Sequence, residues 1–281
     1  MEFAKWEALG NDYVILDEAR GAAAPGPQGI RLICDRHLGV GADGVLLVGA
    51  PPTEHLAASL RIFNADGSEA ELSGNGARQA FLYLSAEGRV PGPEFSISTP
   101  AGDLLGEIIS PTRARVAMGT ASTVSNQYPS GKADGCGTIA AGGELWAFRH
   151  VSIGNPQCAI RIEDPAALEA IEPAVAGAEI QDAAVFPDRT NVSWWSEIAP
   201  GRIRARLFER GVGETTASGT GACGAAVDYR LRGGPADVTV AMDGGELEVT
   251  VGEALDVHLA GEAHETFRGN LSPSLLSRLG A

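Results

Sequence analysis

The feature that most constrains this fold is a short glycine-rich sequence that occurs twice. Residues 72–77 read LSGNGA and residues 217–222 read ASGTGA, about 145 residues later. Each copy follows a glutamate-containing loop and opens a segment rich in small residues, as expected for a helix. Two copies at this separation in a chain of 281 residues predict a duplicated fold of two similar lobes.

Each copy also predicts a helix N-terminus that is accessible to a ligand. The first turn of a helix leaves backbone N–H groups unpaired and carries a partial positive charge, and glycine lets a ligand approach closely. Two such ends facing one cleft would bind a carboxylate and stabilise a negative charge that develops beside it. One copy alone would indicate an ordinary strand-to-helix turn, whereas the pair favours the cleft.

Short apolar runs separated by Gly, Pro, Asn and Asp predict a framework of many strands. Helical patterns are fewer, and they cover 29–36, 75–87, 165–176, 221–232 and a terminal segment that starts at Ser272. The prediction is a mixed α/β (α+β) protein. The first lobe is predicted over residues 1–117 and the second over residues 118–261.

Composition argues against several classes of function. A net charge of −15 disfavours nucleic acid and anionic membranes as partners. The first residues lack the apolar segment of a secretory signal, and no run of 18 apolar residues occurs, so we expect a cytoplasmic protein. The four cysteines and five histidines show no metal-ligand spacing, so no metal site is expected. The GxGxxG match at 39–44 precedes a strand pattern, which is the wrong context for a dinucleotide site.

Several segments, taken together and in order, resemble the diaminopimelate epimerase family over about residues 1–270. They are KWEALGND (5–12), RHLGVGADG (36–44), RIFNADGSEAELSGNGAR (61–78), VSIGNP (151–156), Asn191-Val192 and RLFERGVGETTASGTGA (206–222). The resemblance implies two pseudo-symmetric lobes, each a mixed, mostly antiparallel sheet curled around a central helix, with the ligand cleft between them. It also implies that residues 262–281 return to the first lobe.

The same resemblance implies an isomerase that needs no cofactor and acts at the α-carbon of an amino acid such as LL- or meso-diaminopimelate. Its only implied partners are the small-molecule substrate and, as in many members, a second copy of the chain in a homodimer. In the family one thiolate removes the α-proton and an opposed thiol protonates the other face.

The resemblance assigns roles to individual positions of this chain. Ser73 and Ser218 stand where the family has its two catalytic cysteines, and Gln157 stands where it has a histidine that supports thiol ionisation. The backbone clamps on the reacting carboxylate match Gly74, Asn75, Gly219 and Thr220. The positions that hold the substrate's amino and distal carboxylate groups match Asn11, Asn64, Asn155, Asn191, Glu209 and Arg210, and Gln157 is counted with these substrate-binding residues.

Serine changes the expected chemistry, because its hydroxyl does not ionise usefully without an adjacent base. Loss of a general base costs on the order of 10² to 10⁴-fold in rate. Three explanations stay open. The first is that both cysteines were replaced by serine in the laboratory, but this leaves Gln157 and the glutamate at position 7 unexplained. Alternatively, the chain is a divergent enzyme of the superfamily that uses a carboxylate base on another amino-acid-like substrate, or it is a non-catalytic amino-acid-binding protein. Candidate bases are Glu209 and Glu7, with Asp66 and Glu214 as weaker candidates.

Overall fold

The computed structural model describes residues 1–70 and 72–279, and these residues form two compact units. Unit 1 comprises Met1–Val116 with Ala260–Ala281, and unit 2 comprises Ala117–Leu259. The chain passes from unit 1 to unit 2 within β8 (Arg113–Thr120) and returns within β17 (Asp256–Glu262). Among the described residues, no helix is both long enough and apolar enough to cross a membrane.

Unit 1 is built on one curled sheet in the order β18-β1-β2-β3-β4-β6-β7-β8, with β5 added to β4. The pairs β2–β3 and β4–β6 are parallel and the others are antiparallel. The bounds are β1 (Glu2–Ala8), β2 (Asn11–Asp17), β3 (Gly44–Gly49), β4 (Ser59–Asn64), β5 (Glu69–Ala70), β6 (Glu94–Thr99), β7 (Gly102–Ser110) and β18 (His264–Asn270).

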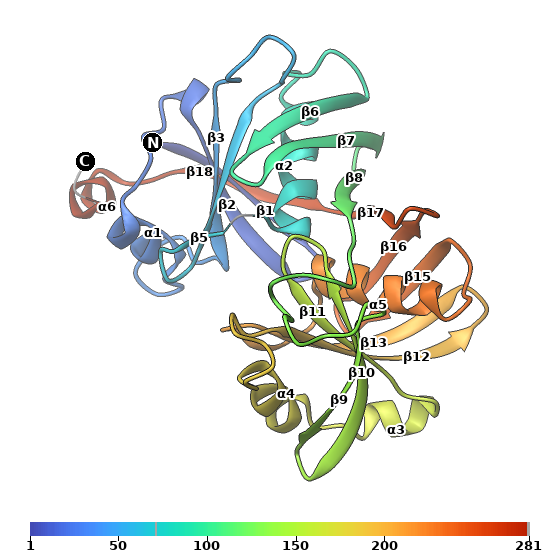
Figure 1. Ribbon diagram of the computed structural model, residues 1–281. Helices are drawn as coiled ribbons and strands as arrows, with labels where there is room; N and C mark the ends of the chain where they lie inside the picture. Colours follow the sequence, from blue (N-terminus) through green and yellow to red (C-terminus); the bar gives the residue numbers. More distant parts are fainter. Residues whose placement is uncertain (71, 280–281) are drawn as a thin grey trace. The chain divides into compact units, whose positions relative to one another are not determined.

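The helix α2 (Gly74–Ala86) lies at the centre of unit 1 and contacts β1, β2, β3 and β7 (Figure 1). Every residue from Gly74 to Leu84 is buried, which the small side chains of its first turns allow. Phe81 packs against Phe95 and against Gly106, where an added Cβ would lie 2.3 Å from the Phe81 ring. Glycine at position 106 is therefore what lets the sheet close on the helix.

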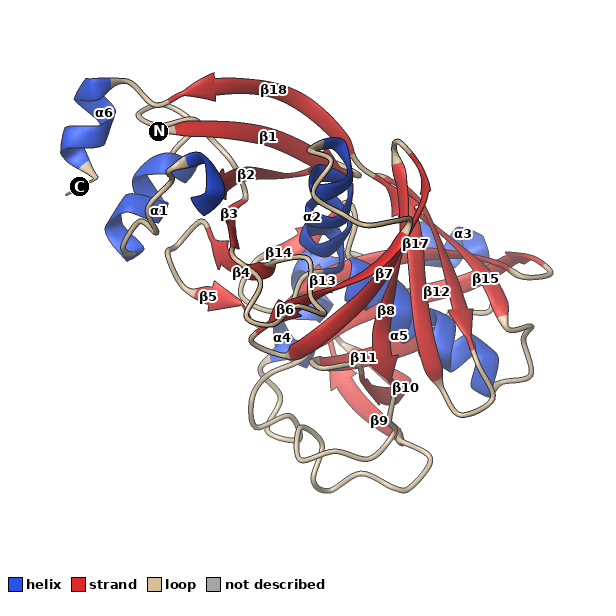
Figure 2. Ribbon diagram, turned by 90° about the horizontal axis from the view of Figure 1, so that it is seen from above, coloured by secondary structure: helices blue, strands red, loops and turns tan. Residues whose placement is uncertain are grey.

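Two further helices cover the outer side of unit 1, beyond the short 3₁₀ helix η1 (Glu18–Arg20). Figures 1 and 2 show α1 (Pro27–Cys34) beside α6 (Pro273–Arg278). Ile30 and Ile33 of α1 belong to a buried cluster on which Leu275, Leu276 and Leu279 pack. Burying these apolar side chains fixes the C-terminal segment on unit 1.

Unit 2 has the sheet order β9-β10-β11-β12-β13-β15-β16, with β14 added to β13. Here β11–β12 and β13–β15 are the parallel pairs. The bounds are β9 (Cys136–Ala141), β10 (Glu144–Ser152), β11 (Pro156–Arg161), β12 (Asn191–Ala199), β13 (Arg202–Glu209), β14 (Gly213–Thr215), β15 (Asp237–Met242) and β16 (Gly245–Val251).

Helices cover both faces of the unit 2 sheet. Successive residues of a strand point to opposite faces, and two neighbouring tryptophans of β12 demonstrate this. Trp194 packs with the cluster that includes Ile180 of α4 (Pro173–Gln181). Trp195 donates to Asp228 of α5 (Gly219–Leu231) at 3.0 Å. The short α3 (Pro165–Glu169) also contacts β12.

The two units repeat one topology, strand for strand. The strands β1 to β4 correspond to β10 to β13, β5 to β14, and β6 and β7 to β15 and β16, with the same parallel and antiparallel pairs throughout. The central helices α2 and α5 both follow the short strand and have 13 residues each. The predicted mixed, mostly antiparallel fold of duplicated lobes is confirmed.

The element predictions fail in two respects. The helix predicted over 165–176 is two helices, because proline at position 173 disfavours helical backbone at Glu172, which has φ −101° and ψ 89°. The strands β1, β5, β7, β9, β14 and β18 lie outside the apolar runs that predicted strands. Much of β7, β9 and β18 is partly or fully exposed, so these strands lack the apolar alternation that identifies a strand in sequence.

Candidate active site

The repeated serines are the N-caps of the two central helices. Ser73 (φ −135°, ψ 120°) and Ser218 (φ −139°, ψ 124°) have nearly the same backbone conformation. The Oγ of Ser73 accepts from the N–H of Gly76 at 3.1 Å, and the Oγ of Ser218 accepts from the N–H of Gly221 at 3.2 Å. Each hydroxyl is thereby fixed at a helix N-terminus, where the helix dipole favours negative charge.

In both units the serine lies near the ends of three adjacent strands whose residues correspond. In unit 1, Tyr13 pairs with Gly44, which pairs with Asn64. In unit 2, Gln157 pairs with Asn191, and the next pair, Val192 with Phe208, brings Glu209 to the same end. The local sequences correspond as well, with GNDY (10–13) and GNPQ (154–157), and RIFN (61–64) and RLFE (206–209). The two units therefore surround equivalent serines with different side chains.

Around Ser73 the nearest functional group is a phenol. The hydroxyl of Tyr13 donates to Ser73 Oγ at 3.3 Å, and the Tyr13 side chain is buried. Asn11 donates to Asp43 at 3.1 Å, and the exposed Asn64 donates to Ser68 at 3.0 Å. The structure thus brings Tyr13 to Ser73, whereas Asn11, at the start of β2, and Asn64, at the end of β4, bond to other polar side chains of the same unit.

Ser218 has a carboxylate among its neighbours, where Ser73 has a phenol. Burial raises the pKa of Glu209, and interactions with the hydroxyls of Thr215 and Ser218 oppose that rise. Among the predicted carboxylates in the described part of the chain, Glu209 is the one that interacts with Ser73 or Ser218.

A chain of amides lies next to Ser218. Gln157 donates to Asn155 at 2.7 Å, and Asn155 donates to Thr220 at 3.2 Å. Gln157 is fully buried and lies against Gly224, where an added Cβ would be 2.8 Å from the Gln157 side chain. Three of the predicted substrate-binding residues therefore support one another: Gln157 and Asn155 at the start of β11, and Thr220 in the first turn of α5.

Asn191 and Arg210 form a second pair in unit 2. Asn191 Oδ1 accepts from the backbone N–H of Arg210 at 2.8 Å, and Asn191 Nδ2 donates to the carbonyl of Pro156 at 3.2 Å. The Arg210 side chain is exposed and donates to the carbonyl of Asp188 at 2.8 Å. Asn191 is therefore a positioning residue for the loop, and the guanidinium of Arg210 keeps further donors for a ligand.

The predicted backbone clamps occupy the first turns of α2 and α5. Gly74 and Asn75 begin α2, and Gly219 and Thr220 begin α5. The Asn75 side chain accepts from Arg78 at 2.8 Å, which makes it part of the buried helix start. The roles of these four residues in ligand binding stay predictions.

The other predicted carboxylates have partners elsewhere. Glu7 accepts from the N–H of Gly10 in the β1–β2 turn at 3.1 Å, and Asp66 accepts from Ser68 at 2.8 Å. Glu214 pairs with Arg206 at 2.7 Å. Each contact is a local structural one, so Glu209 has the strongest claim to be a base.

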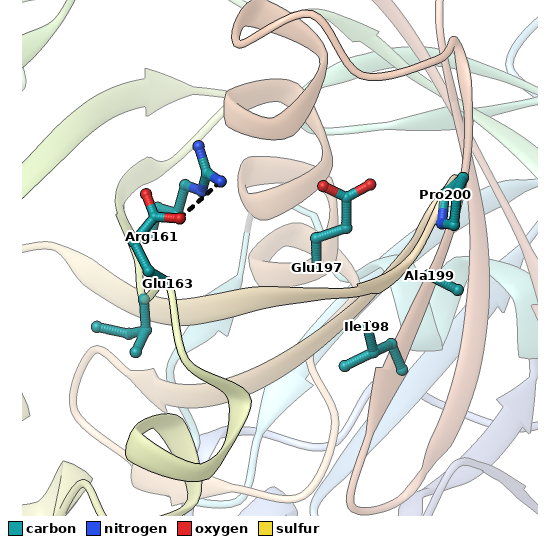
Figure 3. Close-up of a pocket in the computed structure, with 7 residues that line it drawn as sticks. Arg161, Glu163, Glu197, Ile198, Ala199 and Pro200 are labelled. Carbon is teal, nitrogen blue, oxygen red and sulfur yellow. Dashed lines mark hydrogen bonds and ion pairs between the residues drawn. The ribbon is translucent and has the colours of Figure 1, made fainter.

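A surface pocket of about 330 Å³ lies away from these residues in unit 2 (Figure 3). Its charged side chains already have partners: Arg161 pairs with Glu163 at 2.8 Å, and Glu197 accepts from Tyr229 at 2.5 Å. The pocket contains none of the predicted site residues. We assign no function to it.

The Tyr13 contact was missed at the sequence level. A usable signal existed, because GNDY and GNPQ are a second, weaker repeat beside the serine repeat. Aligning GNDY with GNPQ gives Tyr13 the position that corresponds to Gln157, which identifies Tyr13 as a candidate site residue. Its hydrogen bond to Ser73 spans 60 residues of sequence, and only the folded chain shows it.

Comparison with known proteins agrees with the fold and the motifs. The sequence model of the family described as diaminopimelate epimerase matches residues 3–124 and 149–264. The chain is 37% identical over 280 residues to a diaminopimelate epimerase of Pelotomaculum thermopropionicum, covering 96% of this chain and 98% of that protein. It is 38% identical over 276 residues to a diaminopimelate epimerase of Xanthomonas axonopodis pv. citri, covering 96% and 95%.

Solved structures with distant sequences share the fold. A hydroxyproline epimerase from Agrobacterium vitis with bound trans-4-hydroxy-L-proline has a TM-score of 0.69 at 14% identity, covering 96% of this chain and 91% of that chain. A phenazine biosynthesis PhzC/PhzF protein from Clostridium difficile has a TM-score of 0.68 at 15% identity, covering 97% and 99%. The family model matches most of the chain, and diaminopimelate epimerases are 37–38% identical to it over 96% of its length. The chain therefore belongs to the diaminopimelate epimerase family of isomerases.

Proposed function

We propose that this protein inverts the α-carbon of an amino acid and that both serine half-sites act on one bound substrate. The duplicated topology and the family membership support a two-sided site at which one face is deprotonated and the other protonated. The helix N-termini at Ser73 and Ser218 offer N–H groups to the substrate carboxylate, which carries negative charge in the carbanion-like transition state.

The observation that carries this proposal is the place of Glu209 in unit 2. The register of β11, β12 and β13 brings it to the strand end that carries Gln157 and Asn191, and the Ser218 hydroxyl lowers its pKa against the effect of burial. A serine hydroxyl alone cannot remove an α-proton, but a half-buried carboxylate with a raised pKa is a stronger base than an exposed one. Glu209 therefore supplies the base that the absent thiol would have provided. Gln157 and Glu7, which replacement of the two cysteines in the laboratory leaves unexplained, favour a divergent enzyme with a carboxylate base.

The substrate we propose has a second carboxylate, as LL- and meso-diaminopimelate have. Arg210 is exposed, and its planar guanidinium suits bidentate recognition of a carboxylate. Asn191 accepts from the backbone N–H of Arg210 and so fixes the position of this residue, while its guanidinium stays available to a ligand. Asn11, Asn64 and Asn155 would complete the binding of the distal amino and carboxylate groups. We infer no cofactor, and a homodimer is the assembly we propose.

The test is α-proton exchange in heavy water. The purified protein is incubated with LL-diaminopimelate, meso-diaminopimelate, histidine, lysine, ornithine and glutamate, and deuterium at Cα is followed by NMR and mass spectrometry. We expect incorporation and inversion with diaminopimelate above the other amino acids. A thermal shift with one of these ligands and no exchange with any would instead identify a binding protein.

The double variant Ser73→Cys, Ser218→Cys tests how far the rest of the site has diverged. If the other residues still suit thiol chemistry, the variant gains inversion of diaminopimelate by at least about tenfold, because thiols ionise far more readily at helix N-termini. The matched control is Ser85→Cys, on the half-buried side of α2. If Ser85→Cys gained inversion activity as well, the gain would not come from thiols at the helix N-caps.

A further inference from the structure

Two arginines of unit 2 reach across the same junction in opposite directions. Arg210 directly follows β13, and its guanidinium donates to the carbonyl of Asp188 at 2.8 Å. Arg189 is the neighbour of Asp188, and its Nη2 lies 3.9 Å from the position that a Cβ on Gly211 would take. Each side chain therefore extends to the segment that carries the other. Both arginines are exposed, so the two guanidinium groups lie at one surface of unit 2.

Amide side chains fix the junction between these two segments. Asn191 Oδ1 accepts from the backbone N–H of Arg210 at 2.8 Å, and Gln181 Oε1 accepts from the backbone N–H of Gly211 at 2.9 Å. Gln181 and Asn191 are both buried. The backbone that carries Arg210 is therefore held in place, while its guanidinium stays at the surface.

Neither guanidinium has a carboxylate partner in the described part of the chain, although the protein carries a net charge of −15. The carboxylates nearby bond to other groups, because Glu214 pairs with Arg206 at 2.7 Å and Asp182 accepts from Gln181 at 3.1 Å. Asp188 offers its carbonyl to Arg210, and not its carboxylate. Two neighbouring positive charges without a counter-ion repel each other, so an anion bound by both would be favourable.

The backbone of Arg189 has a conformation that is costly for a residue with a side chain. Its φ of 61° lies in the left-handed region, where glycine and asparagine are the residues that fit best. Its N–H closes a turn onto the carbonyl of Phe186 at 2.9 Å, and β12 begins two residues later. The turn itself therefore does not favour arginine at this position. What arginine adds is a guanidinium group beside that of Arg210.

Building on the proposed function, we propose that Arg189 is a specificity-determining residue that binds the distal carboxylate of the substrate together with Arg210. Two guanidinium groups offer charge-assisted hydrogen bonds to both oxygens of a carboxylate. The pair selects amino acids that carry a carboxylate at the end remote from the reacting carbon. That group is what distinguishes LL-diaminopimelate from lysine, which has the same two amino groups and lacks the second carboxylate.

The experiment measures the dissociation constants of LL-diaminopimelate and L-lysine by isothermal titration calorimetry, at low and at high salt. The variants are Arg189→Asn, which removes the guanidinium and suits the left-handed backbone, and Arg189→Lys, which keeps the charge. Arg230→Gln is the matched control. It removes one positive charge from the last turn of α5, where Arg230 donates to the carbonyl of Gly234 at 3.0 Å. Urea denaturation measures the stability of each variant.

In Arg189→Asn we expect the dissociation constant of LL-diaminopimelate to rise about tenfold, while that of lysine changes less than about twofold, since only the first ligand loses a charge-assisted bond. The salt dependence of LL-diaminopimelate binding should weaken as well. The urea midpoint should stay the same or rise, because asparagine relieves the backbone. Arg189→Lys should lose less affinity than Arg189→Asn, and Arg230→Gln should change neither ligand's affinity.

Equal weakening for both ligands, or a lower urea midpoint with unchanged affinity for LL-diaminopimelate, would show that Arg189 is structural and would overturn the inference. A wild-type protein that binds LL-diaminopimelate no more tightly than lysine would overturn it too. These measurements do not depend on turnover. Isotope exchange in a protein without this binding pattern would overturn the inference and leave the proposed function intact, whereas the pattern without exchange would overturn the proposed inversion and leave the subsite.

Discussion

At the scale of single residues, the chemistry of this protein depends on what each serine touches. Ser73 and Ser218 share a backbone conformation and a capping bond, so the serines themselves do not distinguish the two halves. Tyr13 and Glu209 do. Glu209 also has an energetic consequence, because burial of a carboxylate disfavours its charged form and raises its pKa.

The pKa of Glu209 predicts how stability and activity depend on pH. The folded state holds the Glu209 proton more tightly than the unfolded state does. The free energy of unfolding therefore falls as pH rises through the folded pKa, and it stays lower above that pKa. Glu209→Gln should therefore gain stability relative to the wild type as pH rises. Activity of the wild type should rise over the same range as the base ionises.

Urea denaturation at several pH values between about 4 and 8 measures this difference, with inversion rates measured in parallel. Glu253→Gln is the control, because it removes an exposed carboxylate from a turn and should leave the pH dependence of stability close to that of the wild type. A Glu209→Gln variant that loses stability relative to the wild type as pH rises would contradict the assignment.

At the scale of elements, the two central helices combine a structural and a functional role at the same residue. Serine is among the best N-cap residues, because its Oγ satisfies an N–H group that the helix itself leaves unpaired. Both α2 and α5 are almost wholly buried, so an unpaired N–H at their starts would have little access to water. The serines thus stabilise the helices even if turnover is slow.

Removing either cap should destabilise the protein by about 1 kcal/mol. We expect this of Ser73→Ala and of Ser218→Ala, measured as a lower urea midpoint at unchanged slope. Ser85→Ala is the matched control within α2, where alanine is the better helix former and no cap is lost. Equal destabilisation in the control would show that the loss does not come from capping.

At the scale of the whole molecule, unit 1 depends on a segment distant in sequence. Strand β18 pairs with β1 from Glu2↔Asn270 to Glu7↔His264, and Phe3 packs on Phe267 with ring centroids 5.8 Å apart. Without β18, β1 would become an exposed sheet edge, which favours aggregation. Unit 2 has its own edge strand, β9, and among the described residues its sheet is built from strands that lie before residue 260.

Truncation after Glu262 should therefore affect the two units differently. Hydrogen exchange should show loss of protection in β1, whereas amides of α5 stay protected, because the sheet of unit 2 remains complete. Truncation after Leu271 serves as the control, since it keeps β18 and removes only α6 with the residues beyond it. Protection lost equally in α5 and β1 would mean that the units unfold as one.

The sequence by itself determined the serine-capped repeat, the fold class, most of the strands and the position of both central helices. These depend on local signals: a capping residue with glycines, a run of small residues, and apolar alternation. The strands it missed are largely exposed ones such as β9 and β18, and the split of α3 from α4 depended on one proline.

Only the tertiary structure decided which side chains meet each serine. Tyr13 reaches Ser73 through the register of β2 on β3, and the space at Gly44 admits its ring. Glu209 was one of several candidate carboxylates until the end of β13 placed it beside Ser218. Such contacts depend on sheet register and packing between segments far apart in the chain, which no local pattern encodes.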